Sequence, residues 1–203
     1  MRDYEKLKLA MKKAAKRAYD IRLQSGDGGN LSVRIAEEEL ILIKASGCSF
    51  GEMEGENIVL VDFKGIPVEG SGKPSREIKT HIEIYRQRPD VTAIFHCHSP
   101  WSTACSMTSD AIPSVSLPME MKLGLIPVLD AGESHADTEV AKAVKIFLEQ
   151  NPNIKAFIQR RHGIFSMSTN IIKAEHNAEL VEESAQIAQL IKIEGKFNIK
   201  EIR

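Results

Sequence analysis

The segment 91–99 constrains the fold of this chain most, because an apolar run of strand-forming residues ends in two histidines separated by one cysteine. Its composition predicts a buried β-strand. Side chains alternate between the two faces of a strand, so His96 and His98 should point the same way and Cys97 away from them. Two imidazoles that leave a rigid strand together are suited to hold Zn²⁺ or a similar divalent metal.

A third histidine has a comparable position in the sequence. His162 follows a second apolar strand at 156–159 and precedes Gly163, which leaves room for close approach. Catalytic zinc usually has three protein ligands and one open position for water or substrate. Glu77 adds a carboxylate at the start of a predicted helix. These residues together predict a metalloenzyme, whereas a single histidine beside a buried strand more often serves only as a hydrogen-bonding group.

The bulk properties of the chain exclude several classes of protein. At 203 residues the chain suits a single domain that spans 1–203. A net charge of −1 gives no electrostatic basis for binding nucleic acid or an anionic membrane. Three cysteines without framework spacing argue against a disulfide scaffold and for a reducing compartment. Since no run approaches the ~18 apolar residues of a membrane span, we expect a cytoplasmic protein without a membrane partner.

The hydrophobic pattern predicts alternating helices and strands. Helical spacing is found at 4–24, 76–88, 101–107, 137–149 and 171–193. Ser75 is the predicted N-cap of the second of these helices. Strand patterns are found at 31–35, 39–44, 57–62, 91–98, 126–129 and 156–159, and 68–74 is a loop by composition. We therefore expect one α/β domain of the α+β type, with a central, mostly antiparallel or mixed sheet covered by helices on both sides.

Three loops carry small residues that can present backbone amides or hydroxyl groups: 28–30, 46–47 and the segment around Ser75. Backbone amides in glycine-rich turns and at helix N-termini bind phosphate without any net charge. Lys73 and Arg76 flank the third loop and can add positive charge. None of the loops has a nucleotide-binding pattern, and ordinary turns share their composition.

Taken together, these motifs resemble those of the class II aldolase/adducin family. They occur in the order and spacing of that family and cover about residues 5–195. The matching segments are Gly29-Asn30-Leu31-Ser32-Val33-Arg34, Ala45-Ser46-Gly47, Lys73-Pro74-Ser75-Arg76-Glu77, His96-Cys97-His98 and Arg161-His162-Gly163. Each motif is weak alone, but five in register are specific. The resemblance implies a class II aldolase-like fold.

The resemblance also implies a set of site residues and a reaction. Zinc, or another divalent metal, would be bound by His96, His98 and His162, with Glu77 as a catalytic acid/base that can also bind the resting metal. Zinc would polarise the carbonyl of a ketose 1-phosphate and stabilise the enediolate formed on cleavage to dihydroxyacetone phosphate and an aldehyde. The enzyme would be a homotetramer with active sites at subunit interfaces. The substrate phosphate would lie against Gly29, Asn30, Ser46, Gly47, Ser75 and Arg76.

Other members of the family leave further functions open. The segment 119–122 is similar to the one that carries the catalytic glutamate of methylthioribulose-1-phosphate dehydratase, which would make Glu120 catalytic, although a solvated surface carboxylate fits equally. Arg76 replaces a serine in the phosphate loop of L-fuculose-1-phosphate aldolase, and a tyrosine used there in proton transfer has no match here. The resemblance is also compatible with a sugar-phosphate epimerase, a decarboxylase or a non-catalytic adducin-like interaction module.

Overall fold

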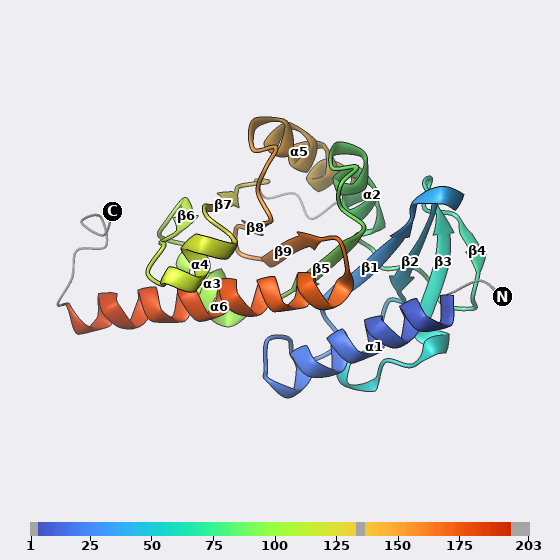
Figure 1. Cartoon of the computed structure of the whole chain (residues 1–203), viewed down its shortest axis with the longest axis horizontal. Helices are drawn as coiled ribbons and strands as arrows, with labels where there is room; N and C mark the ends of the chain where they lie inside the picture. Colours follow the sequence, from blue (N-terminus) through green and yellow to red (C-terminus); the bar gives the residue numbers. More distant parts are fainter. Residues whose placement is uncertain (1–3, 133–136, 196–203) are drawn as a thin grey trace.

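The computed structural model describes residues 4–132 and 137–195, which form one nine-stranded sheet (Figure 1). The strand order is β4-β3-β2-β1-β5-β9-β8-β7-β6. All neighbouring strands are antiparallel except β7 and β8, so the expected mixed, mostly antiparallel sheet is confirmed. The strands are β1 (Asn30–Ile35), β2 (Leu40–Lys44), β3 (Ile58–Asp62), β4 (Pro67–Glu69), β5 (Ala93–Cys97), β6 (Ala111–Ile112), β7 (Ile126–Leu129), β8 (Ala156–Gln159) and β9 (Gly163–Ser168).

Helices cover both faces of this sheet, as expected. α2 and α5 pack over one apolar core, and α1, α3, α4 and α6 pack over the other (Figure 1). Within the described ranges, no helix is both long and apolar enough to cross a membrane. The helices are α1 (Tyr4–Asp20), α2 (Ile78–Gln87), α3 (Pro100–Ser106), α4 (Leu117–Lys122), α5 (Asp137–Gln150) and α6 (Ile171–Glu194), with short 3₁₀ turns at Ala36–Glu38, Phe50–Glu52 and Gly55–Asn57.

The central strand β5 sends its side chains alternately into the two cores. Phe95 and Cys97 belong to the core beneath α1 and α6, whereas Ile94 belongs to the core beneath α2 and α5. His96 is on the same side as Ile94 and stacks on Phe165 of that core, with ring centroids 4.0 Å apart. The predicted alternation of histidine and cysteine is therefore confirmed.

Helix α2 begins later than the sequence pattern predicts. The prediction of Ser75 as its N-cap is wrong, because the helix begins at Ile78 with Glu77 as N-cap. Residues 73–75 pair with the end of β2 instead, where the Ser75 amide donates to the Lys44 carbonyl at 3.1 Å. This pairing keeps the backbone extended, so the helix can start only after the chain has left the strand. The Ser75 hydroxyl accepts a hydrogen bond from the Glu77 amide at 3.3 Å.

Several other elements differ from the expectations, since the short strand β6 and the short helix α4 are also absent from the predicted set. β4 lies partly within the predicted loop 68–74, and its three exposed residues begin with a proline, as suits a sheet edge. β9 is absent from the predicted set, because its pairing with both β5 and β8 is a long-range effect. Helix α1 ends at Asp20 rather than at residue 24, since Arg22 adopts the left-handed conformation with φ 61°.

Candidate metal centre

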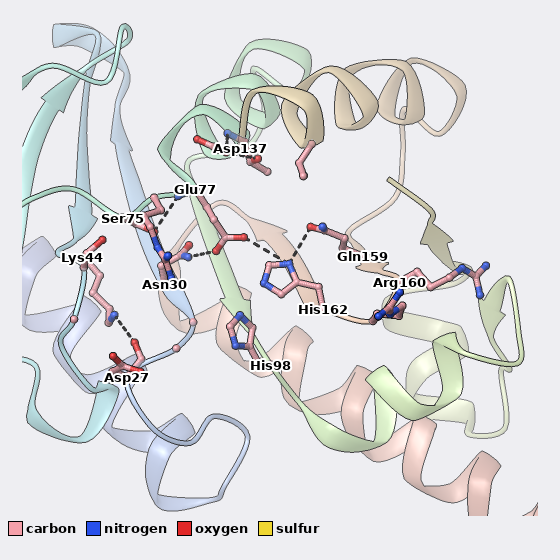
Figure 2. Close-up of a pocket in the computed structure, with 18 of the residues that line it drawn as sticks. Asp27, Asn30, Lys44, Ser75, Glu77, His98, Asp137, Gln159, Arg160 and His162 are labelled. Carbon is pink, nitrogen blue, oxygen red and sulfur yellow. Dashed lines mark hydrogen bonds and ion pairs between the residues drawn. The ribbon is translucent and has the colours of Figure 1, made fainter. Parts of the chain in front are cut away.

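Four side chains meet where the end of β5, the turn between β8 and β9, and the start of α2 come together (Figure 2). Glu77 is the N-cap of α2, His96 is in β5 with His98 just beyond it, and His162 is in the β8–β9 turn. One ligand atom of each lies within 4.8 Å of the other three, an arrangement that can hold a metal ion. We call these four residues the metal centre.

His96 is fully buried, and its hydrogen bonds fix its tautomer. Nδ1 lies 2.8 Å from the carbonyl oxygen of Ile164, which can only accept, so Nδ1 carries the proton. The lone pair of Nε2 is then left 3.1 Å from His98 Nε2 and 3.3 Å from Glu77 Oε2. Burial, together with the neighbouring histidines, lowers the pKa of His96 well below its ordinary value. The ring is therefore neutral at neutral pH, the form that binds metal.

The loop after α1 positions His98. The Gln24 side chain accepts a hydrogen bond from the His98 amide at 2.7 Å, and burial lowers the pKa of His98. Gly29 in this loop has φ +66°, and a Cβ there would lie 2.6 Å from Gln24 Oε1 and 2.9 Å from the His96 carbonyl oxygen. Only glycine therefore lets the loop pass so close to the end of β5.

His162 reaches the metal centre because β9 packs tightly against β5. A Cβ at Gly163 would lie 2.1 Å from the carbonyl oxygen of Cys97, so the close approach predicted at this glycine is confirmed. His162 Nδ1 lies 3.1 Å from Gln159 Oε1 and 3.6 Å from Glu77 Oε1. The amide of Gln159 thus orients the third imidazole, a role that no sequence motif predicts.

Glu77 combines a sheltered position with one direct hydrogen bond. Its side chain is 21% exposed, and the Asn30 amide donates to Oε2 at 2.5 Å. Burial raises the pKa of Glu77 to about 7, against the opposing effect of the Asn30 hydrogen bond and with a further increase from the charge of Asp137. A carboxyl group that titrates near neutral pH can both accept and return a proton.

The metal centre opens into a cavity of about 380 Å³. Figure 2 shows Lys44 and Ser75 on one side of Glu77 and His162, and Arg160 on the other side. The structure brings together all the residues that the sequence analysis assigned to phosphate: the cavity is lined by Gly29, Asn30, Ser46, Gly47, Ser75 and Arg76.

Lys44 and Asp137 also line the cavity, although no sequence motif predicts a place for either residue there. Lys44 is 2% exposed, its Nζ donates to the Asp27 carbonyl at 3.3 Å, and burial lowers its pKa. Asp137 accepts hydrogen bonds from the backbone amides of Lys79 at 2.7 Å and Thr80 at 2.9 Å. Asp137 thereby caps the first turn of α2 from the start of α5 and fixes the helix end that carries the carboxylate of the metal centre.

Glu120 lies apart from the metal centre. It is on the exposed surface of the short helix α4, and it is not among the described residues that line the cavity. Within one chain, the structure does not bring Glu120 to Glu77. A catalytic role for Glu120 therefore stays a prediction.

Comparisons with known proteins agree with this architecture. Residues 10–189 match the model of a family described as class II aldolase and adducin N-terminal domain. An L-fuculose phosphate aldolase of Methanococcus vannielii is 29% identical over 176 residues, which cover 85% of this chain and 90% of that protein. A 3-oxo-tetronate 4-phosphate decarboxylase of Pectobacterium atrosepticum is 31% identical over 171 residues, covering 80% and 74%. A solved structure of an L-fuculose 1-phosphate aldolase has a TM-score of 0.82 at 29% identity, covering 94% of this chain and 88% of that one.

Proposed function

This chain belongs to the class II aldolase and adducin N-terminal domain family, and on that premise we propose that it is a metal-dependent lyase acting on a phosphorylated ketose. One observation carries the proposal: a single cavity joins the metal centre to the small-residue loops that suit a phosphate. The likeness to fuculose phosphate aldolases supports aldol cleavage as the reaction. Its products would be dihydroxyacetone phosphate and an aldehyde.

The donor set of the metal centre fits zinc. Three imidazoles and one carboxylate are ligands that zinc accepts, and the carbonyl of Ile164 already orients the buried His96 with its lone pair toward the other donors. The same donors would also accept Co²⁺, Mn²⁺ or Fe²⁺. When bound, the metal supplies Lewis-acid polarisation of a substrate carbonyl.

The phosphate of the substrate would be held by the loops on the Lys44 side of the cavity. The hydroxyl groups of Ser46 and Ser75 and the small residues around them suit an oxyanion. Lys44 adds positive charge on this side of the cavity (Figure 2), and Arg76, which follows Ser75 in the chain, also lines the cavity. Anchoring the phosphate there would fix the carbonyl carbon near the metal centre.

Glu77 would transfer the proton. The Asn30 hydrogen bond holds one carboxylate oxygen, and the carboxylate lies beside the histidines in the cavity, within reach of a substrate bound there. In cleavage, the Glu77 carboxylate would accept the proton of the substrate hydroxyl group whose carbon becomes the aldehyde. After the carbon–carbon bond has broken, it would return that proton to the carbon of the dihydroxyacetone phosphate fragment.

Decarboxylation and dehydration are the alternatives to aldol cleavage, and the observations support the first more than the second. Decarboxylation of a phosphorylated keto acid is the second candidate, because the 31% identical relative is named a 3-oxo-tetronate 4-phosphate decarboxylase and the cavity contains Arg161, whose charge suits a carboxylate. A dehydratase reaction has less support, since Glu120 lies outside the cavity. A non-catalytic adducin-like module would have no use for the four assembled donors of the metal centre.

We also propose that the protein is cytoplasmic and that residues 1–203 form one domain that assembles as a homotetramer. Exposed apolar side chains support contact between copies: Leu117, Met121 and Leu125, on and after α4, are 66%, 77% and 61% exposed. Light scattering coupled to size-exclusion chromatography would measure the number of subunits. If two copies contribute residues to one cavity, two inactive variants with substitutions at different residues should regain activity when they are mixed.

The function is tested by incubating zinc-loaded protein with a panel of ketose 1-phosphates and analysing the products by mass spectrometry. We expect dihydroxyacetone phosphate and an aldehyde from at least one substrate, and neither from metal-free protein. A product lighter by one water would favour the dehydratase, and carbon dioxide from a keto-acid phosphate would favour the decarboxylase. Equal turnover by metal-free protein would contradict the proposal.

A further inference from the structure

The cavity contains an arginine for which the fold itself has no evident use. Arg160 and Arg161 are adjacent and both line the cavity. Arg160 is neutralised, because its guanidinium lies 2.6 Å from an oxygen of Asp110 and 2.9 Å from an oxygen of Asp130. Arg161 is exposed, and no carboxylate of the described residues forms an ion pair with its guanidinium. One of the two charges is therefore structural and the other is available to a ligand.

The backbone at Arg161 has a conformation that arginine adopts at an energetic cost. Its φ of 63° is in the left-handed region, which glycine or asparagine would occupy with less strain. The turn cannot relax, because the Arg160 amide donates to the Leu129 carbonyl at 2.8 Å and the His162 amide donates to the Gln159 carbonyl at 3.0 Å. Strained residues of this kind are concentrated at binding and catalytic sites.

The positive charges of the cavity lie at its two ends. Figure 2 shows Lys44 and Ser75 on one side of the metal centre and Arg160 on the other. Arg161 follows Arg160 directly along the chain and lines the same cavity. A substrate with its phosphate at the Lys44 end and its carbonyl at the metal centre would therefore extend its remaining carbons toward Arg161.

We infer that Arg161 binds a second anionic group on the substrate, at the end opposite the phosphate; this rests on the proposed function. A guanidinium presents a planar fork of donors that matches a carboxylate or a phosphate with two hydrogen bonds. The substrate class is then a phosphorylated sugar acid or a sugar bisphosphate, rather than a ketose phosphate with an uncharged tail. Loss of such a charged pair weakens binding roughly 10- to 100-fold.

The test uses three four-carbon probes and zinc-loaded full-length protein in a calorimetric titration. Erythritol 4-phosphate and 4-phosphoerythronate differ only in that the second has a carboxylate at the far end. Wild-type protein should bind the acid roughly 10- to 100-fold more tightly than the alcohol. Arg161→Asn should abolish this preference and leave the Kd for erythritol 4-phosphate unchanged. Erythritol 1,4-bisphosphate distinguishes a carboxylate from a second phosphate as the bound group. If the bisphosphate binds more tightly than 4-phosphoerythronate, the subsite is assigned to a phosphate.

Arg22→Asn is the matched control. Arg22 is also an exposed arginine with a left-handed backbone, at φ 61°, and it is not among the residues that line the cavity. Both asparagine variants should be at least as stable as wild type, since asparagine tolerates this conformation better. The inference would be overturned if wild type bound the acid and the alcohol with equal affinity, or if Arg161→Asn lost the same factor in affinity for both. Failure of wild-type protein to bind erythritol 4-phosphate at all would contradict the proposed function, and the inference with it.

Discussion

Glu77 and Glu175 are on helices that cover opposite faces of the sheet, and burial raises the pKa of each carboxyl group to about 7. Glu77 lines the cavity, accepts a hydrogen bond from Asn30 and faces three histidines. Glu175, a residue of α6, is fully buried, and no described group donates a hydrogen bond to it. Its nearest cationic atom is Arg17 Nε, at 3.5 Å.

The difference between these two acids shows what a raised pKa does and does not indicate. Burial alone is enough to raise the pKa of a carboxyl group. A reactive role also needs access for a substrate and neighbours that use the proton, and only Glu77 has both. The surroundings of Glu77 in the cavity therefore suit proton transfer, whereas the buried carboxyl group of Glu175 on α6 only costs stability when it is ionised.

The sharpest contrast between the two faces is within β5, between adjacent residues. His96→Ala removes a buried donor of the metal centre, so lyase activity should fall about 10³-fold or more. Cys97→Ala changes only the opposite core and should keep kcat/KM within about threefold, at a stability cost of about 1 kcal/mol. Steady-state kinetics and zinc analysis of both variants give the comparison. Similar activity in the two variants would show that the histidine face is not the active one.

The two acids themselves give the next largest contrast. Glu77→Gln should lower kcat roughly 10²- to 10⁴-fold, because an amide cannot transfer the proton. Glu175→Gln should leave kcat within about threefold, since this residue does not line the cavity. The measurement is kcat at saturating substrate for both zinc-loaded variants. A comparable loss of kcat in the two variants would contradict the view that the cavity and the histidines, and not the raised pKa alone, distinguish the reactive acid.

The pH dependence of the free energy of unfolding should reveal how much stability is lost when the buried Glu175 ionises. Burial raises its pKa from 4.5 to about 7, so the folded protein binds more protons than the unfolded chain between these values. The contribution of Glu175 to stability is therefore greatest below about pH 4.5 and is lost as the pH rises toward 7. At pH 8, Glu175→Gln should increase the free energy of unfolding by about 1–3 kcal/mol, with little gain at pH 4.5. Urea titrations of the metal-free proteins test this, and a gain that does not vary with pH would contradict it.

The smallest effect is expected at Glu120, which lies neither in the cavity of Glu77 nor in the core around Glu175. Glu120→Gln should change the rate of aldol cleavage less than about threefold, because the side chain is exposed on α4 and outside the cavity. The rate of dihydroxyacetone phosphate formation measures this directly. A large loss would mean that Glu120 reaches the cavity of a neighbouring copy and takes part in the cleavage.

Local rules were sufficient for one part of the metal centre. The alternation of side chains along a strand correctly separates His96 from Cys97, and the glycine after His162 correctly predicts a close approach between strands. The proximity of Glu77 to these histidines was not a local property, and its prediction depended on the family resemblance.

Long-range contacts determined what the sequence could not predict. Helix α2 starts late because the Ser75 amide is bonded to the end of β2, and its first turn is capped by Asp137, which lies 57 residues beyond Thr80 in the chain. Lys44 simply ends an apolar strand in the sequence, and only the packed loops place it in the cavity. In both cases the partner is distant in the chain, so no local pattern contains the information.

The most direct measurement is a calorimetric titration of metal-free protein with Zn²⁺, since every proposed step depends on the metal centre. Wild type and Cys97→Ala should each bind one Zn²⁺ per chain with equal affinity. His96→Ala should lose at least about 100-fold in affinity, because one buried donor is gone. Equal zinc binding by His96→Ala and wild type, or no zinc binding by wild type, would contradict the account.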